Sequence, residues 1–106
     1  WGTYTILEDS NGYKIKRIEV KPHKRLSLQS HKFRNEHWIV VEGCATITLN
    51  DKVFTLNQNE STYIKAGDKH RLLNDTDKAL VIIEAQVGSY TGEDDIERFD
   101  DDFKRN

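Results

Sequence analysis

Cysteine, proline and methionine are almost missing from this chain of 106 residues, which has one cysteine, one proline and no methionine. A single cysteine excludes an intrachain disulfide, so we expect a cytoplasmic protein rather than a disulfide-stabilised one. Cys44 adjoins a strand-like segment, and we interpret it as a small buried side chain and not as a reactive thiol.

Long apolar runs and an excess of one charge are missing as well. No run approaches the roughly 18–20 apolar residues that a membrane span requires, and the start shows no signal-peptide pattern. The net charge is only −2, so neither nucleic acid nor an anionic membrane is an expected partner. The chain begins at Trp1 rather than Met, and we expect an upstream segment to have been removed.

Short strand-like segments separated by turn signals fill most of the chain. The apolar phase of one segment slips between Ile15 and Ile18, which predicts a bulge or bend there. No segment before Gly88 shows a sustained helical period. Many short strands with regular turns favour an all-β sandwich or closed barrel. The expected strands cover residues 4–7, 13–20, 25–28, 37–41, 45–49, 53–56, 61–64, 71–73 and 79–86.

The C-terminal segment differs from the rest because it is strongly acidic. Ile96, Phe99 and Phe103 recur there at a spacing of three to four residues. This period predicts a short amphipathic C-terminal helix with a solvated acidic face. We therefore expect a single domain over 1–106, with a barrel over 1–90 and an acidic tail or helix over 91–106.

Four polar side chains could meet inside a rolled sheet: Gln29, His31, Glu36 and His70. Residues two apart on a strand share a face, so Gln29 and His31 point the same way, and a turn would return Glu36 on the next strand. Only a rolled or closed sheet would bring His70 to them. Imidazoles and a carboxylate suit one divalent metal, with zinc as the first candidate, although the sequence does not distinguish zinc from other divalent ions.

The spacing of these residues resembles the two motifs of the cupin superfamily. The first motif is Gln29-x-His31, then Glu36 and Gly43, and the second is Gly67-x-x-His70-x-x-x-Asn74. The resemblance implies a cupin barrel, that is, a double-stranded β-helix or jelly roll, and it implies metal binding by Gln29, His31, Glu36 and His70.

Five blocks, residues 1–4, 26–31, 34–43, 59–64 and 88–98, resemble the cupin domain of type II phosphomannose isomerases more closely. In that family of mannose-6-phosphate isomerases the cupin is commonly the C-terminal domain of a bifunctional mannose-1-phosphate guanylyltransferase/phosphomannose isomerase. Nothing in this chain resembles the nucleotide-binding start of the guanylyltransferase. We therefore expect a stand-alone isomerase or a detached domain, serving polysaccharide biosynthesis.

The resemblance implies a metal-dependent aldose–ketose isomerase that interconverts mannose 6-phosphate and fructose 6-phosphate through a cis-enediol(ate). Arginine suits bidentate contact with the phosphate of such a substrate. The proton-transfer base stays open among Asp95, His37 and a metal-bound water, and His37 should face away from Glu36 on its strand. The expected catalytic residues are Arg34, Arg98 and Asp95, and the expected substrate-binding residues are Arg25, Lys24 and His37.

Three other functions remain open. Lys32 and Phe33 stand where many relatives have histidines, which favours a non-catalytic cupin that binds metal and sugar phosphate as a sensor or regulatory module. A metal-dependent oxygenase is disfavoured by Gln29, since oxygenases usually have more histidine ligands. The last alternative is a metal-free structural cupin. Because cupins often pair through their outer sheets, we expect a homodimer.

Overall fold

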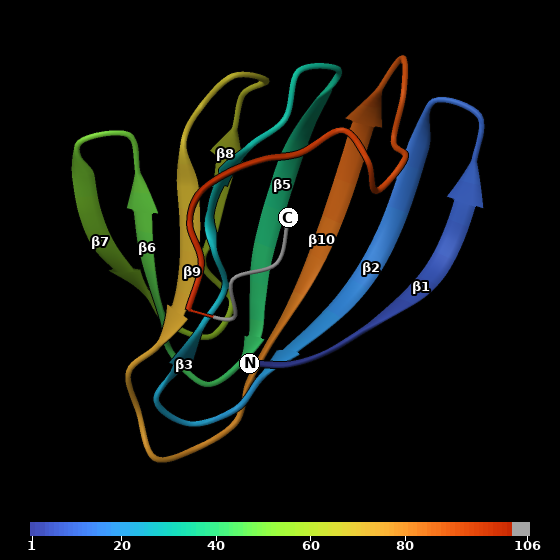
Figure 1. Cartoon of the computed structure of the whole chain (residues 1–106). Coiled ribbons are helices and arrows are strands. Elements are labelled where there is room, and N and C mark those ends of the chain that lie inside the picture. Colours follow the sequence, from blue (N-terminus) through green and yellow to red (C-terminus); the bar gives the residue numbers. More distant parts are fainter. Residues whose placement is uncertain (103–106) are drawn as a thin grey trace.

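Two antiparallel β-sheets face each other and form a barrel with one open end (Figure 1). The computed structural model describes residues 1–102. Sheet A has the strand order β1-β2-β10-β5-β8, and sheet B has the order β11-β4-β9-β6-β7 with β3 paired to β9. The fold is a cupin-type double-stranded β-helix, as the sequence predicted. Residues 1–102 contain no helix that could cross a membrane.

Most strands overlap the segments expected from the sequence, but the expected strand 25–28 is replaced by two short strands, and the strand over Glu97–Asp100 was not expected. The strands are β1 (Gly2–Ser10), β2 (Tyr13–Val20), β3 (Lys24–Arg25), β4 (Leu28–Ser30), β5 (Arg34–Glu42), β6 (Ala45–Leu49), β7 (Lys52–Leu56), β8 (Ser61–Ile64), β9 (His70–Asn74), β10 (Leu80–Gly88) and β11 (Glu97–Asp100).

The inner face of sheet A is apolar at one end of the barrel and polar at the other. Ile82 on β10 lies in register with Ile18 and Val40 and belongs to the buried core. Two residues further along β10, Glu84 replaces the apolar side chain and lies opposite Lys16. The apolar half stabilises the fold by burying hydrocarbon, and the polar half lies beneath the mouth of the barrel.

The expected bulge in β2 is wrong. The strand runs in unbroken register with β10, and the irregularity lies on β1, between Ile6 and Glu8. The apolar phase slips because the inward face of the strand changes from apolar to polar. Ile18 and Lys16 both point inward, whereas Ile15 lies on the outer side of the strand.

The expected C-terminal helix is also wrong within the described residues. Glu97–Asp100 form β11, which pairs antiparallel with β4. Phe103, which the helix prediction also used, lies outside the described residues. The strand forms because β4 offers an unpaired edge, and the backbone hydrogen bonds gained there outweigh a local helical period.

The outer face of sheet A carries exposed apolar side chains, including Ile39, Tyr63 and Val87. Such a face can pair with a second copy. The homodimer expected from the sequence stays a prediction.

Candidate active site

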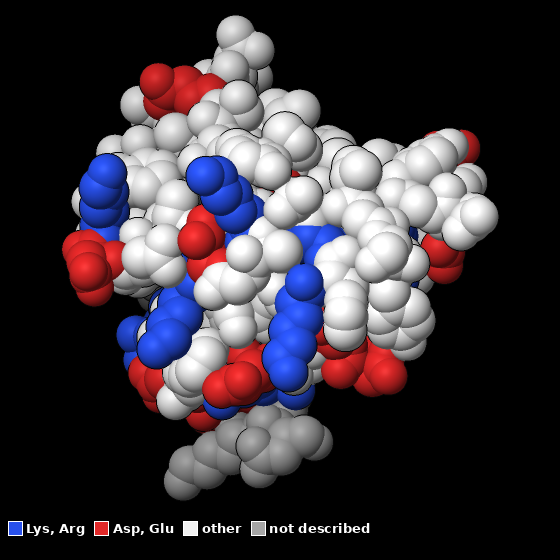
Figure 2. Space-filling view, turned by 90° about the horizontal axis from the view of Figure 1, so that it is seen from above, with Lys and Arg blue, Asp and Glu red and all other residues white. Residues whose placement is uncertain are grey.

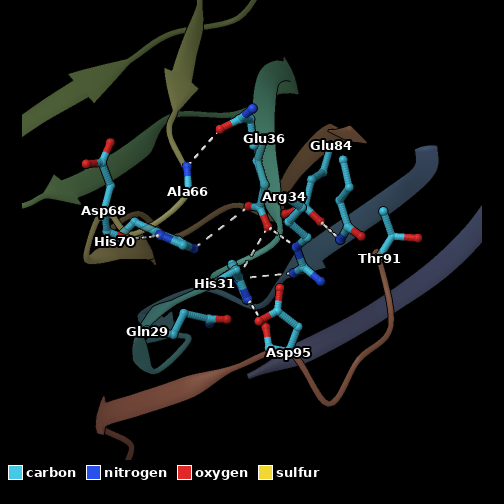
Figure 3. A network of polar contacts seen from close by, with 12 residues as sticks. Gln29, His31, Arg34, Glu36, Ala66, Asp68, His70, Glu84, Thr91 and Asp95 are labelled. Carbon is cyan, nitrogen blue, oxygen red and sulfur yellow. Dashed lines mark hydrogen bonds and ion pairs between the residues drawn. The ribbon is translucent and has the colours of Figure 1, made fainter. Parts of the chain in front are cut away.

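The polar end of the barrel brings His31, Glu36 and His70 together (Figure 3). His31 follows β4, Glu36 points inward from β5, and His70 begins β9. One ligand-type atom from each residue lies within 4.8 Å of those of the other two. The three residues are 4%, 1% and 2% exposed, so the cluster is held inside the protein.

Each imidazole is fixed by a backbone carbonyl at Nδ1. The Nδ1 of His31 lies 2.6 Å from the carbonyl oxygen of Asp95, and that of His70 lies 3.0 Å from the carbonyl oxygen of Asp68. A carbonyl only accepts, so Nδ1 carries the proton in both rings. Each Nε2 therefore presents its lone pair toward Glu36, at 3.3 Å from Oε2 for His31 and 3.8 Å from Oε1 for His70.

Both histidines are held in the neutral form that binds metals. Burial and, as a smaller cause, the positive charge of Arg34 lower the pKa of His31 to about 4. Burial also lowers the pKa of His70. At neutral pH the two Nε2 atoms are therefore acceptors, which is the protonation state of an imidazole ligand.

Arg34 lies across the cluster. Its Nε donates to Oε2 of Glu36 at 2.8 Å, and its Nη2 donates to Nε2 of His31 at 3.1 Å. A metal ion bound by Glu36 and His31 would take the place of these contacts and release the guanidinium group toward the adjoining cavity. The Nη1 of Arg34 is buried and has no hydrogen-bond partner among residues 1–102.

A cavity of about 200 Å³ adjoins the cluster and is lined by Gln29, His31, Arg34 and Arg98 among others. Gln29 lies in register with His70 on the neighbouring strand, and its amide nitrogen donates to the hydroxyl of Ser27 at 3.2 Å. That contact engages the amide nitrogen of the side chain. Gln29 thus lies on the strand next to His70, and its role as a fourth metal ligand stays a prediction.

Three basic side chains, those of Lys16, Arg34 and Arg98, line this cavity together with Glu84 and Glu93. Lys16 lines it, and its Nζ lies 2.7 Å from the carboxylate of Glu93, which also pairs with the buried Lys14 at 3.1 Å. Arg98 reaches it from β11, and its Nε is buried without a hydrogen-bond partner in the described chain, 3.9 Å from the Asp101 carboxylate. Figure 2 shows basic and acidic side chains mixed over this end of the barrel.

Asp95 holds the loop that carries His31. Its two carboxylate oxygens accept from the backbone N–H groups of Lys32 at 3.0 Å and Phe33 at 2.9 Å. Burial of the carboxylate favours its neutral form, but these N–H donors outweigh burial and hold the pKa of Asp95 below its usual range. A carboxylate of low basicity with both oxygens engaged suits a positioning role better than proton transfer.

We expect Asp95→Asn to destabilise the protein by about 1–3 kcal/mol at pH 7, because an amide nitrogen cannot accept one of the two N–H bonds. The folded pKa of Asp95 is depressed, so its stabilisation is complete above the unfolded pKa of about 3.9 and is lost as the pH falls through the lower folded value. Urea denaturation at pH 7 and pH 3 should therefore show a difference between wild type and variant that shrinks in acid. A difference that grows in acid would contradict this assignment.

Three residues expected to bind substrate are not brought to the cavity. His37 is exposed on the outer face of β5, with its ring 4.7 Å from that of Tyr63. Arg25 pairs with Asp102 at 2.8 Å on the surface. Lys24 is exposed and lies opposite Asn74, four residues along β9 from His70, which is about 13 Å on a strand.

Sequence reasoning missed Glu84, Trp38, Gln86 and Lys16. Burial and the nearby Glu36 carboxylate raise the pKa of Glu84 to about 7. The sequence did contain a signal for Glu84. Leu80, Ile82 and Glu84 are alternate residues of β10, so their side chains lie on the same, inward face of the strand.

Comparisons with known proteins find a matching family and several similar proteins. The family described as Mannose-6-phosphate isomerase C-terminal matches residues 1–101. The alginate biosynthesis protein AlgA of Pseudomonas aeruginosa is 51% identical over 105 residues, which are 99% of this chain and 22% of that protein. A mannose-1-phosphate guanylyltransferase of Salmonella montevideo is 48% identical, over 100% of this chain and 22% of that protein.

The xanthan biosynthesis protein XanB of Xanthomonas campestris pv. campestris is 50% identical, with 99% of this chain and 22% of the relative covered. The chain thus spans 22% of the length of these relatives. Among solved structures, a Klebsiella pneumoniae protein with a double-stranded β-helix domain superposes with a TM-score of 0.81 at 14% identity, covering 92% of this chain and 83% of its own. At that identity the likeness shows the fold alone.

Proposed function

Because this chain belongs to the mannose-6-phosphate isomerase C-terminal family, we propose that it is a metal-dependent aldose–ketose isomerase that interconverts mannose 6-phosphate and fructose 6-phosphate. One observation carries the proposal. A cluster of metal-type ligands reaches through His31 to a cavity that is also lined by Arg34 and Arg98, and each of these two arginines has one buried guanidinium nitrogen without a hydrogen-bond partner in residues 1–102. A metal ion held by the cluster would bind the sugar oxygens, and the guanidinium groups of Arg34 and Arg98 would bind the phosphate.

The residues fit a divalent ion, with zinc as the first candidate. Two neutral Nε2 atoms and one carboxylate converge, and each imidazole is oriented by a carbonyl at its other nitrogen, as is usual for metal-bound histidines. Gln29 would supply the fourth ligand. When bound, the ion would polarise the sugar oxygens and stabilise negative charge on them.

The other side chains would bind and orient the substrate. Arg34 and Arg98 would hold the phosphate, because a guanidinium group matches a phosphate in two parallel hydrogen bonds. Lys16 adds a positive charge on the same wall. Asp95 would keep His31 and the loop after β4 in place. A homodimer and a cytoplasmic location remain predictions of the same account.

We expect Arg98→Gln to raise the KM for mannose 6-phosphate by about 10–150-fold with a smaller change in kcat, since a hydrogen bond to a charged group contributes about 1.5–3 kcal/mol. The matched control is Arg17→Gln. Arg17 is exposed and pairs with Glu19 outside the cavity. Steady-state kinetics of both variants measures the effect. An unchanged KM in Arg98→Gln would remove Arg98 from the phosphate site.

The proposal is tested by assaying aldose–ketose interconversion of the purified protein with and without added Zn²⁺, alongside metal analysis. Turnover that requires about one ion per chain is expected. Binding of metal and sugar phosphate without turnover would contradict the isomerase and favour the sensor or regulatory module.

A further inference from the structure

Glu84 is a carboxyl group buried inside the barrel with no structural need for its charge. It points inward from β10, between Lys16 on β2 and Trp38 on β5 in the strand register. It is 5% exposed and lines the same cavity as His31 and Arg34. Burying a carboxyl group is costly unless its polar atoms are satisfied, and an apolar residue would continue the core begun by Ile82.

Its contacts connect it to the metal-type cluster. The Trp38 Nε1 donates to Oε1 of Glu36 at 2.9 Å and to Oε2 of Glu84 at 3.0 Å. The Gln86 amide donates to Oε1 of Glu84 at 2.5 Å. Both donors are uncharged, so they fix the carboxyl group in place without committing it to an ion pair. The charged groups that face it are Glu36, Arg34 and Lys16.

The other candidate bases are engaged elsewhere. Glu36 belongs to the metal-type cluster, and both oxygens of Asp95 hold backbone N–H groups. The Glu93 carboxylate is paired with two lysines. His37 lies on the outer face of β5. Of the carboxyl groups that line the cavity in residues 1–102, Glu84 alone combines burial with uncharged partners.

We propose that Glu84 is the residue that carries the proton between C2 and C1 of the substrate, an assignment that rests on the isomerase function proposed above. In the forward direction its carboxylate removes the proton from C2 of the open-chain aldose. The C–H electron pair becomes the C1=C2 double bond, and the carbonyl pair moves to O1, which gives the enediolate.

The second half of the reaction returns the same proton. Glu84 delivers it to C1, the hydroxyl proton of O2 passes to O1, and O2 becomes the carbonyl oxygen of the ketose. Atoms and charge balance with no oxidant or reductant, as an isomerisation requires. Glu84 must be ionised when it takes the proton and protonated before it returns it. Its two uncharged hydrogen-bond donors, Trp38 and Gln86, hold it in place in both states.

The test is Glu84→Gln in the whole chain, compared with the wild type and with Glu19→Gln, a matched change at an exposed position of β2. The variant should fold, because the Oε1 of Gln86 lacks a partner among the described residues and can accept from the new amide after rotation. We expect kcat and the incorporation of solvent deuterium at C1 of fructose 6-phosphate to fall together by about 10²–10⁴-fold.

Two readouts do not depend on turnover. The zinc content of Glu84→Gln and its affinity for mannitol 6-phosphate, which has no carbonyl group, should stay within about threefold of wild type. The threefold limit is about 0.7 kcal/mol, well below the loss expected for a removed ligand or phosphate contact.

The outcomes separate the two proposals. A Glu84→Gln variant that keeps more than a third of the wild-type kcat overturns the assignment of Glu84 and leaves the isomerase intact. A wild-type protein that binds zinc but exchanges no deuterium overturns both. Should Glu84→Gln not fold, Glu84→Asp decides: withdrawing the carboxyl group by about one bond length should lower kcat by roughly 10²-fold, and an unchanged kcat would overturn the assignment.

Discussion

His70→Ala is expected to abolish stoichiometric metal binding and to lower isomerase activity by at least about 10²–10³-fold, the loss typical when one stabiliser of a developing oxyanion is removed. His70 supplies one of the two Nε2 atoms that face Glu36, and its ring is locked by the Asp68 carbonyl. Removing it leaves His31, Glu36 and the weaker amide donor Gln29, which are too few strong ligands to retain the ion. Metal analysis after dialysis measures the effect.

The fold should survive this change. His70 lies at the polar end of the barrel, where its ring is 5.4 Å from that of the core residue Trp38, and its loss removes this contact and one hydrogen bond worth about 1 kcal/mol. His37→Ala is the matched control, because His37 neighbours Glu36 in sequence but lies on the outer face. The control should keep its metal. Retention of one ion per chain in His70→Ala would contradict the site.

Gly88→Ala is expected to destabilise the protein by about 3 kcal/mol or more and to weaken metal binding. A Cβ at this position would lie 2.1 Å from the carbonyl oxygen of Phe33 and 2.7 Å from the Cα of Arg34. Both atoms belong to the backbone, so the strand carrying Arg34 must move, and overpacking of this kind costs about 1–3 kcal/mol or more. The displacement also pulls on the loop that Asp95 holds through Phe33.

Gly12→Ala is the control for Gly88→Ala, because it introduces backbone strain without steric overlap. Gly12 has a φ of +92°, but a Cβ there would have nothing within 4 Å among the described residues. Its replacement should cost only about 1–2 kcal/mol, the penalty of the left-handed region, and should not affect the metal. Urea denaturation and zinc titration of the two variants give the comparison. If the two variants lost the same stability and the same zinc affinity, overlap between a Cβ at position 88 and the backbone of Phe33 and Arg34 would not be the cause.

The strand pattern and part of the site could be predicted because they are encoded locally. Alternating apolar residues predicted the strands, and the two-residue spacing placed Gln29 and His31 on one face, with Glu36 returning on the next strand. His70 needed the family motif, because the sequence separation says nothing of where β9 lies. Its position beside Glu36 follows from the rolled sheet that Figure 1 shows.

The polar inner wall of the barrel could not be predicted in the same way. Lys16 and Glu84 were hidden because charged residues on strands are normally solvent-facing. For Lys16 the sign was the slipped apolar phase of residues 13–20, and a bulge explained that slip equally well. Only the register of β2 with β10 shows that Lys16 and Glu84 face each other inside the barrel.

The acidic tail was misinterpreted for a related reason. A cluster of carboxylates with a helical period suggested a solvated helix face, yet several of these carboxylates have partners far along the chain. Glu93 pairs with Lys16, and Asp100 pairs with Arg71. Pairing over such separations depends on the closed barrel, which one sequence without its fold does not reveal.

Anomalous X-ray diffraction at the zinc absorption edge, from crystals grown with zinc, tests the central claim most directly. We expect one strong anomalous peak per chain, coordinated by Nε2 of His31, Nε2 of His70 and a carboxylate oxygen of Glu36. A fully occupied peak elsewhere with none at this cluster, or density showing the three side chains turned away from a common point, would contradict the account.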